Sequence, residues 1–250
     1  MNKYFFFTVD TEIDKSPNWK IAKSNYFDSI NYGVKKLLYP LLSKYNIKST
    51  FLLSPEVLED NHTVEILKSI QTPETEFGTH LHSEFIEPQR SLFKYNMGGN
   101  LADKFQNEYN KEIEFLKLKN LTNIFKEKFN YNPLSFRAGR YAKSSFTNKF
   151  LIELGYKVDS SITPGLKWKN NSAIVDYSYH NNDLKIIKNN NNLLYCLPIS
   201  IHNKNIYFNR LFYNDKIYSK IICKIFKKYV GYDWLRPAYN KQFNLDFFFN

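Results

Sequence analysis

The chain has few of the residues that crosslink or loosen a small protein. Its two cysteines, Cys196 and Cys223, are spaced neither as a disulfide framework nor as a metal knuckle. Free thiols of a cytoplasmic protein are the simplest interpretation. Eight glycines and nine prolines among 250 residues give no indication of disorder.

Long apolar runs are absent as well. Residues 4–9 are apolar but too few for the core of a signal peptide, and no small-residue cleavage site follows them. No run approaches the length of a membrane span, so we expect a cytoplasmic protein. With 43% hydrophobic residues and no linker of shifted composition, the chain favours a single domain over residues 1–250 with a sizeable core.

Acidic residues are scarce late in the chain, where much of the net charge of +11 arises. Residues 204–228 hold seven basic side chains against one acid, with isoleucines at helical spacing. This segment predicts a basic amphipathic helix, which could rest on anionic lipid as a peripheral membrane contact. A helix that covers the core and turns solvated lysines outward is the favoured alternative. No recognition motif accompanies the charge, so nucleic acid is not expected as a partner.

Residues 4–12 (YFFFTVDTE) combine a buried strand with two acids. Four aromatics and a valine form a run of strand length, without the polar alternation of a half-exposed strand. Asp10 and Glu12 stand where that strand should end. In α/β barrels the carboxyl ends of the strands carry the chemistry, and carboxylates there hold metals or act as general bases. A strand that ends in solvated acids is the plain alternative.

Two of the five histidines, His80 and His82, lie one residue apart. Neutral imidazoles with nearby carboxylates are the usual ligands of zinc or a similar divalent ion. On an extended segment both rings point the same way and can reach one ion. If the chain turns helical after Thr79, His80 and Glu84 share a face instead. Because the D-x-E strand precedes them, a metal site is favoured over two half-exposed loop histidines.

A third pattern places two arginines around a glycine, at Arg137, Gly139 and Arg140. Gly139 permits a tight turn or a positive φ angle. Arg137 can clamp a carboxylate through two parallel hydrogen bonds, and Arg140 can do the same or meet an anionic substrate. Taken alone, the pattern favours a surface turn with solvated arginines.

Together these patterns resemble the motifs of the polysaccharide deacetylase superfamily, the NodB-homology proteins of carbohydrate esterase family 4. Residues 8–12 (TVDTE) are similar to its first motif, usually T-F-D-D-G, and residues 78–82 (GTHLH) resemble its histidine motif. Residues 136–141 (FRAGRY) resemble its R-x-P-x-G motif, and order and spacing also match, over residues 3–202. The variant with D-x-E, H-x-H and R-A-G-R resembles a branch associated with bacterial surface-polysaccharide gene clusters.

The resemblance implies an α/β fold, an irregular (β/α) barrel. It implies a hydrolase that removes an acetyl group from a sugar of a bacterial surface polysaccharide or its precursor. The expected cofactor is a divalent metal, with Zn²⁺ as the expected ion. His80 and His82 are the implied ligands, with Glu12 or Asp10 as the third. The family's ligand aspartate aligns with Thr11, which is a departure.

Asp10 aligns with the general base of the family, and Arg137 aligns with the arginine that orients it. Arg140, Tyr141 and Asp159 are expected to bind substrate, with Asp159 as a partner for an arginine.

A second departure concerns the late histidine that protonates the leaving amine in this family. His202 is the nearby substitute and is taken as the third catalytic residue. Residues 245–250 (LDFFFN) read as a final strand cut before such a histidine, so the last strand of the barrel is expected to be incomplete. A degenerate or truncated member that binds glycan without catalysis is therefore the alternative function. A different metal hydrolase is a weaker option, because H-x-H also opens the amidohydrolase motif.

Periodicity and turn residues predict strands that alternate with helices, and hence a parallel sheet. Strands are expected at residues 4–9, 47–53, 76–82, around 136, 156–159 and 193–201, and helices at 28–45, 55–70, 100–129 and 144–154. The helix at 28–45 is expected to bury Ile30, Val34, Leu37, Leu38, Leu41 and Leu42. Residues 168–192 are expected to be irregular, with one hairpin.

Overall fold

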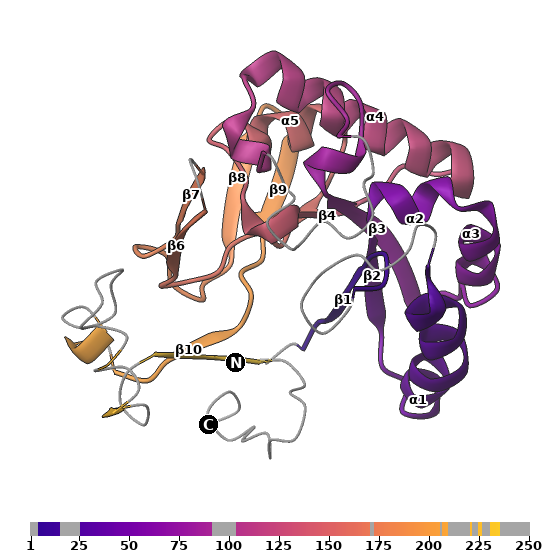
Figure 1. Cartoon of the computed structure of the whole chain (residues 1–250), viewed down its shortest axis with the longest axis horizontal. Coiled ribbons are helices and arrows are strands. Elements are labelled where there is room, and N and C mark those ends of the chain that lie inside the picture. Colours follow the sequence, from indigo (N-terminus) through magenta and orange to yellow (C-terminus); the bar gives the residue numbers. More distant parts are fainter. Residues whose placement is uncertain are drawn as a thin grey trace.

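A mostly parallel seven-stranded sheet forms the centre of the molecule (Figure 1). The computed structural model describes residues 5–15, 26–91, 104–170, 173–205, 207–209, 221, 225–226 and 231–235. The strands lie in the order β1-β2-β3-β4-β5-β9-β8, and all neighbours are parallel except β9 and β8. Their bounds are β1 Phe7–Thr11, β2 Ser49–Leu53, β3 Thr75–Leu81, β4 Ser135–Ala138, β5 Val158–Asp159, β8 Lys185–Asn189 and β9 Asn192–Cys196.

Helices connect the parallel strands from β1 to β5, whereas no helix lies between β5 and β9 among the described residues. They are η1 Ser29–Leu38, α1 Tyr39–Lys44, α2 Pro55–Glu59, α3 Asn61–Lys68, α4 Lys111–Phe129 and α5 Thr147–Glu153, with short 3₁₀ turns η2 Ser83–Phe85, η3 Gln106–Glu108 and η4 Gly139–Tyr141. In Figure 1, α1, α2 and α3 gather beside β1 and β2, and α4 and α5 lie along the later strands. Two antiparallel pairs lie outside the main sheet: β6 Lys167–Asn170 with β7 Ala173–Asp176, and β10 Ile201–Asn203 with β11 Tyr232–Trp234.

The core consists of aromatic and aliphatic side chains on the central strands. Phe51 of β2, Phe77 of β3 and Phe136 of β4 are fully buried, and Phe51 lies opposite Phe77 in the strand register. Both faces of these strands are covered, so polar residues within them, such as His80 and Arg137, are buried as well. At Gly78 the strands approach so closely that a Cβ atom would lie 2.5 Å from the Ser135 carbonyl oxygen. Only glycine fits this position of β3.

This architecture confirms the predicted α/β fold class. β1 and β8 are the two edges of the sheet, and no pairing among the described residues closes it into a full barrel. Residues 245–250, expected to form an incomplete last strand, lie outside the described part of the chain. Most of the basic segment 204–228 lies outside it too, so its membrane contact stays a prediction. Within the described ranges, no helix has the length and apolar character to cross a membrane.

The helix expected at residues 28–45 is present but is wound differently. Its first part, η1, is a π-helix, in which hydrogen bonds join residues five apart instead of four. Ile30 and Val34 face the core as expected. Leu37 and Leu41 are 61% and 52% exposed, so their predicted burial is wrong. The wider turn rotates them off the stripe that faces the core.

Two further predicted elements are interrupted. The helix expected at residues 55–70 divides at Asp60, whose carboxylate accepts a hydrogen bond from Thr63 N at 2.8 Å and caps α3. The strand expected at residues 193–201 ends at Cys196, shortly before Pro198, which has no N–H to donate to a strand ladder. Residues 201–203 then pair in a separate small sheet. His202, which follows the predicted strand, therefore does not stand at the carboxyl end of a strand of the main sheet.

Candidate active site

The carboxyl ends of β1 and β3 bring Glu12, His80 and His82 together. The strand register sets Thr11 and Thr79 level with each other across β2, and Glu12 and His80 follow one residue later. One ligand atom from each of the three side chains lies within 4.8 Å of the others. The three predicted metal ligands therefore form one compact cluster that could bind a metal ion.

Alternation along β1 decides which acid reaches the histidines. Successive strand residues point to opposite faces, so Asp10 and Glu12 share one face and Thr11 takes the other, where it is buried. The Glu12 carboxylate oxygens lie 3.3 Å from His80 Nε2 and 3.4 Å from His82 Nε2. Of the two alternatives that the sequence left open, the geometry favours Glu12 as the third ligand.

The hydrogen bonds of the two imidazoles favour a cation between them. His80 Nδ1 lies 3.0 Å from the Arg137 carbonyl oxygen, and His82 Nδ1 lies 3.4 Å from Glu84 Oε1. Both partners accept hydrogen bonds, so we assign the ring proton of each neutral histidine to Nδ1. The two Nε2 lone pairs then face each other at 3.1 Å, beside the Glu12 carboxylate. Such outer hydrogen bonds are those that orient metal-binding histidines, so the donor set fits a divalent ion.

Each carboxylate of the cluster has a basic partner, Lys15 for Glu12 and Arg140 for Glu84, and the two carboxylates also act on His82. Burial by itself lowers the pKa of His82, but the Glu12 and Glu84 carboxylates outweigh it and raise that pKa to about 9. Burial raises the pKa of Glu12, yet the His82 and His80 rings lower it well below its usual value. The cluster thus attracts positive charge, whether a proton or a metal ion supplies it.

The Arg137 side chain holds Asp10, the predicted base, in place. Its Nη1 donates to Asp10 Oδ1 at 2.6 Å, its Nη2 donates to Thr8 Oγ1 at 2.8 Å, and its Nε donates to the Ser160 carbonyl at 3.1 Å. The Arg137 side chain is 4% exposed, whereas that of Asp10 is 26% exposed. The guanidinium therefore fixes a carboxylate that still reaches solvent.

The turn after β4 is held in an unusual conformation. Arg140 and Tyr141 both have positive φ angles, 53° and 58°, which side chains larger than glycine rarely adopt. At Gly139 a Cβ atom would lie 2.4 Å from the Leu81 carbonyl oxygen, so the turn packs directly on the end of β3. Paired strained residues of this kind concentrate at functional sites.

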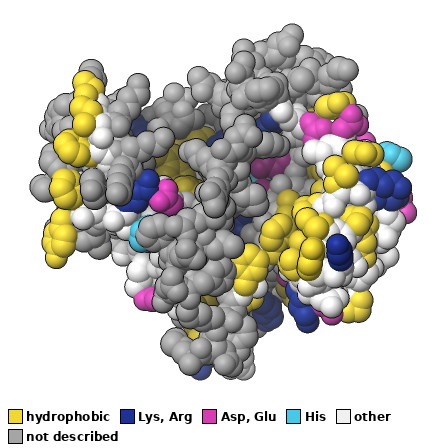
Figure 2. Space-filling view, turned by 90° about the horizontal axis from the view of Figure 1, so that it is seen from below, with side chains coloured by type: hydrophobic (Ala, Val, Ile, Leu, Met, Phe, Trp, Pro, Cys, Tyr) yellow, Lys and Arg dark blue, Asp and Glu magenta, His cyan; other side chains and the backbone are white. Residues whose placement is uncertain are grey.

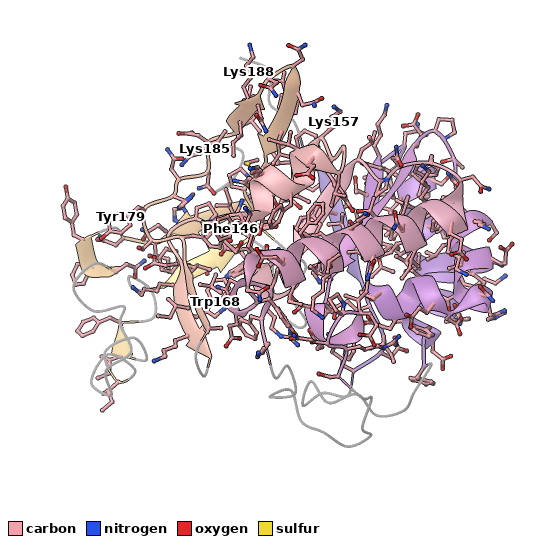
Figure 3. The ribbon with its side chains drawn as sticks, turned by 90° about the horizontal axis from the view of Figure 1, so that it is seen from above. Phe146, Lys157, Trp168, Tyr179, Lys185 and Lys188 are labelled. Atoms are coloured by element: carbon pink, nitrogen blue, oxygen red, sulfur yellow. The ribbon has the colours of Figure 1, made fainter. Side chains whose placement is uncertain are left out.

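The predicted substrate residues Arg140 and Tyr141 point to different surroundings. Arg140 Nη2 donates to Glu84 Oε1, which also accepts from His82. Arg140 therefore holds the carboxylate that orients His82. Tyr141 lies in an aromatic group, with its ring centroid 6.3 Å from Trp168 and 5.7 Å from Trp234. Figure 3 labels Trp168, which β6 carries.

The other two predicted residues lie apart from the cluster. Asp159 is fully buried, and its ion pair is with Lys143 rather than with the expected arginine. His202 stands opposite Asp233 in the β10–β11 pair. The next residue of β11, Trp234, packs on Tyr141, and alternation turns His202 to the opposite face of this pair. The roles predicted for Asp159 and His202 stay predictions.

The structure gives three buried charged residues of the site roles that the sequence analysis did not predict. Glu84 was considered only as an alternative ligand, and Lys117 lies within an ordinary helical pattern. Lys117 is fully buried and donates from Nζ to the Ser83 and Ile86 carbonyls, both at 2.7 Å, which fixes the loop after His82.

Glu56, in the first turn of α2, is the third of these residues. It is 8% exposed, and neither carboxylate oxygen has a hydrogen-bond partner among the described residues. Burial raises its pKa, and the charged groups that act on it include His82, Glu12 and Lys15.

Comparisons with family models and with curated protein sequences find no match. Solved structures with partial similarity include a Mycobacterium smegmatis protein provisionally described as a polysaccharide deacetylase (15% identity, TM-score 0.44, covering 68% of this chain and 46% of that one). PuuE allantoinase matches at 14% identity and TM-score 0.45, over 80% and 56% of the two chains. The Streptococcus pyogenes deacetylase PplD, solved with acetate, matches at 15% and 0.38, over 55% and 52%. This chain thus spans about half the length of these proteins. Similarity this low is no basis for an activity.

Proposed function

We propose that this protein is a metal-dependent deacetylase of the polysaccharide deacetylase superfamily. Its proposed substrate is an acetylated sugar of a bacterial surface polysaccharide or of its precursor. One observation carries the proposal: the Asp10 carboxylate, held by Arg137, shares the carboxyl edge of the sheet with Glu12, His80 and His82. A fixed carboxylate beside a metal-binding cluster is the combination that hydrolysis of an amide or ester requires.

Glu12, His80 and His82 would hold the ion, for which Zn²⁺ is the expected identity. When bound, such an ion polarises the acyl carbonyl and makes water more acidic. His80 and His82 are buried, with 3% and 4% of their side chains exposed, whereas 19% of the Glu12 side chain reaches solvent. The open side of the cluster is therefore the side of the two acids, where substrate can approach.

Asp10 is proposed to take the proton of the attacking water. Its Oδ1 accepts from Arg137 at 2.6 Å, which holds the carboxylate in one orientation. Thr8 Oγ1 and the Ser160 carbonyl accept hydrogen bonds from the same guanidinium. Contacts from two distant parts of the chain therefore fix the group that orients the base. Positioning of this kind is where a general base gains its effect.

Support for a sugar as substrate comes from the aromatic group at the η4 turn. Tyr141 directly follows Arg140, and it packs with Trp168 and Trp234, all three partly exposed. Binding sites for small molecules are typically lined by hydrophobic and aromatic side chains, with a few polar groups that orient the ligand. We place the sugar ring against this aromatic group, with its acetyl group toward Glu12.

The proposal is tested by metal content and acetate release together. The purified protein should carry one divalent ion per chain and release acetate from a member of a panel of acetylated sugars. The double variant His80→Ala/His82→Ala should lose both, and the control His62→Ala, which removes an exposed histidine, should lose neither. Metal bound in full by the double variant would rule out this site. Metal and glycan binding without acetate release would instead favour the non-catalytic family member.

The proton donor for the leaving group needs its own experiment. An amine leaving group depends on a positioned donor, typically worth about a hundred- to ten-thousand-fold, and an alkoxide depends on it less. If His202 does not serve, the protein should be weak on N-acetyl sugars and better on O-acetyl esters. The measurement is the rate ratio on paired N- and O-acetyl substrates, for the wild type and for His202→Ala. Strong amide hydrolysis that is unchanged in His202→Ala would contradict both branches.

A further inference from the structure

The first helices carry an apolar face that points away from the core. Tyr32, Leu37, Leu41 and Tyr45 are 62%, 61%, 52% and 61% exposed. They recur at four- to five-residue spacing along η1 and α1, which the π-helical winding turns into a single outward stripe. We call these four residues the outer helix face. Residues of this type are ordinarily buried, so a continuous exposed stripe indicates a binding surface.

The stripe continues to the amino-terminal edge of the sheet. Phe6, which is 61% exposed, precedes β1, and α1 leads directly into β2, whose first residue lies opposite Phe7. Figure 2 looks onto this region and shows hydrophobic side chains gathered over the helices, with basic side chains among them. The surface is therefore larger than one helix turn.

All charged residues within 29–48 are basic, and one of them, Lys48, pairs with the exposed Glu74 carboxylate at 3.3 Å. Residues 29–48 contain Lys35, Lys36, Lys44 and Lys48, with no aspartate or glutamate. Lys44 Nζ lies 5.3 Å from the centroid of the Tyr45 ring, so charge and aromatic surface are presented together. Aromatic, leucine and lysine side chains on one helix face are the composition of helices that lie in a membrane interface.

We propose that the outer helix face binds the surface of an anionic phospholipid membrane. The alternative occupant, a second copy of this chain, is disfavoured by charge. A two-fold interface would bring the lysine-bearing patches of both copies together, since each copy presents the same patch. An anionic lipid surface instead meets these lysines with opposite charge, while Leu37 and Leu41 enter the apolar layer.

This placement leaves the metal cluster accessible. The outer helix face extends to the amino edge of the sheet, whereas Glu12, His80 and His82 stand at the carboxyl edge. Membrane binding and chemistry are thus separable, and the inference rests on the fold and surface alone, not on the proposed reaction.

Flotation of the full chain with lipid vesicles tests the inference. Vesicles of phosphatidylcholine with about one third phosphatidylglycerol should carry the wild type at low salt, and phosphatidylcholine alone should carry little. Lys36→Glu/Lys44→Glu should lower the partition coefficient about 25-fold or more, at about fivefold per basic residue removed from the surface. Leu37→Ser/Leu41→Ser should lower it about tenfold or more through lost apolar burial. Since all four positions are exposed, far-ultraviolet circular dichroism should be unchanged in both variants.

A matched control lies at the other edge of the sheet. Ile186 on β8 is 57% exposed and stands between lysines in a similar basic setting. Figure 3 labels Lys185 and Lys188 there, away from the violet half that holds the first helices. Ile186→Ser/Lys188→Glu should float like the wild type. Absence of wild-type flotation, or equal loss in the control, would overturn the inference. So would a dimer in sedimentation that Leu37→Ser/Leu41→Ser dissociates, because the face would then join two copies.

Discussion

At the scale of single residues, Arg137 links the parts of the site. Its guanidinium donates to Asp10, Thr8 and Ser160, and its own carbonyl accepts from His80 Nδ1. One residue thus orients the proposed base through its side chain and a proposed ligand through its backbone. A substitution of the side chain should disturb only the first of these functions.

We expect Arg137→Lys to lower kcat/KM for acetate release about a hundredfold while metal stoichiometry stays unchanged. Lysine keeps the charge but cannot bond to Asp10 and Thr8 from one planar group. Arg90→Lys is the matched control, because Arg90 makes a comparable paired contact, to the exposed Glu59 carboxylate at 2.8 Å from both nitrogens. Full activity in Arg137→Lys would assign Arg137 a structural role only.

Glu56 leads to a prediction for the metal-free protein. Burial raises its pKa in the folded state above the usual value of 4.5, so between the two values the folded chain holds a proton that the unfolded chain has lost. The free energy of unfolding should therefore fall as pH rises through this window. Glu56→Gln should remove that fall and be the more stable protein above it. Denaturant unfolding across pH measures the difference, and exposed Glu65→Gln is the control. A difference between Glu56→Gln and wild type that does not change with pH would contradict the prediction.

Some site residues were predictable from local spacing, and others were not. The two-residue period of a strand puts His80 and His82 on one side, and the same period separates Asp10 and Glu12 from Thr11. Glu56 and Lys117 gave no such signal, because their burial arises from helices that pack over the strand ends. No local pattern encodes that packing.

At the scale of elements, the η4 turn and the end of β3 are a single packed unit. Gly139 contacts the Leu81 carbonyl, and the next residues hold Arg140 against Glu84. The position of His82 therefore depends on a turn more than fifty residues away in the sequence. A glycine substitution tests this dependence without touching a charged group.

Gly139→Ala should destabilise the fold by about 1–3 kcal/mol, because the new Cβ atom overlaps the Leu81 carbonyl and forces the two segments apart. It should also weaken metal binding, since Leu81 immediately precedes His82. Gly33→Ala is the control: its nearest neighbour would lie 4.0 Å away, and alanine favours a helix by about 0.5–1 kcal/mol. Thermal unfolding and metal titration of both variants decide the matter. Equal stability and metal affinity in the two would mean that the turn and β3 are independent.

Some of the helices and strands could likewise be predicted from the local sequence, and others could not. Strands β1 and β2 follow from apolar runs, whereas β3 and β4 include several polar residues. The parallel sheet follows from the alternation of strands with helices. The π-winding of η1 could not be predicted, because the apolar pattern of residues 28–45 fits an α-helix equally well. The early end of β9 could have been expected from Pro198 alone.

At the scale of the whole molecule, the cluster joins chain segments that are distant in sequence. Glu12 follows β1, whereas His80 and His82 come from the end of β3 and the residue after it, with β2 between the two strands. β1 is an edge of the sheet and gains its pairing from β2 alone among the described strands. An ion held by all three residues would therefore stabilise the edge of the sheet as well as serve catalysis.

The last prediction concerns this stabilisation. An ion that binds the folded chain only, at a free concentration about a hundred times its Kd, stabilises it by about 2.7 kcal/mol. For a domain of this size that corresponds to a rise in Tm of about 5–10 °C. Chelated protein titrated with Zn²⁺ in a thermal-unfolding assay should show this rise. His62→Ala should show it equally, and His80→Ala/His82→Ala should show none, because only the double variant removes the Nε2 atoms that face Glu12. An unchanged Tm in the wild type, or an equal rise in the double variant, would place metal binding elsewhere and leave the edge strand to be held by protein contacts alone.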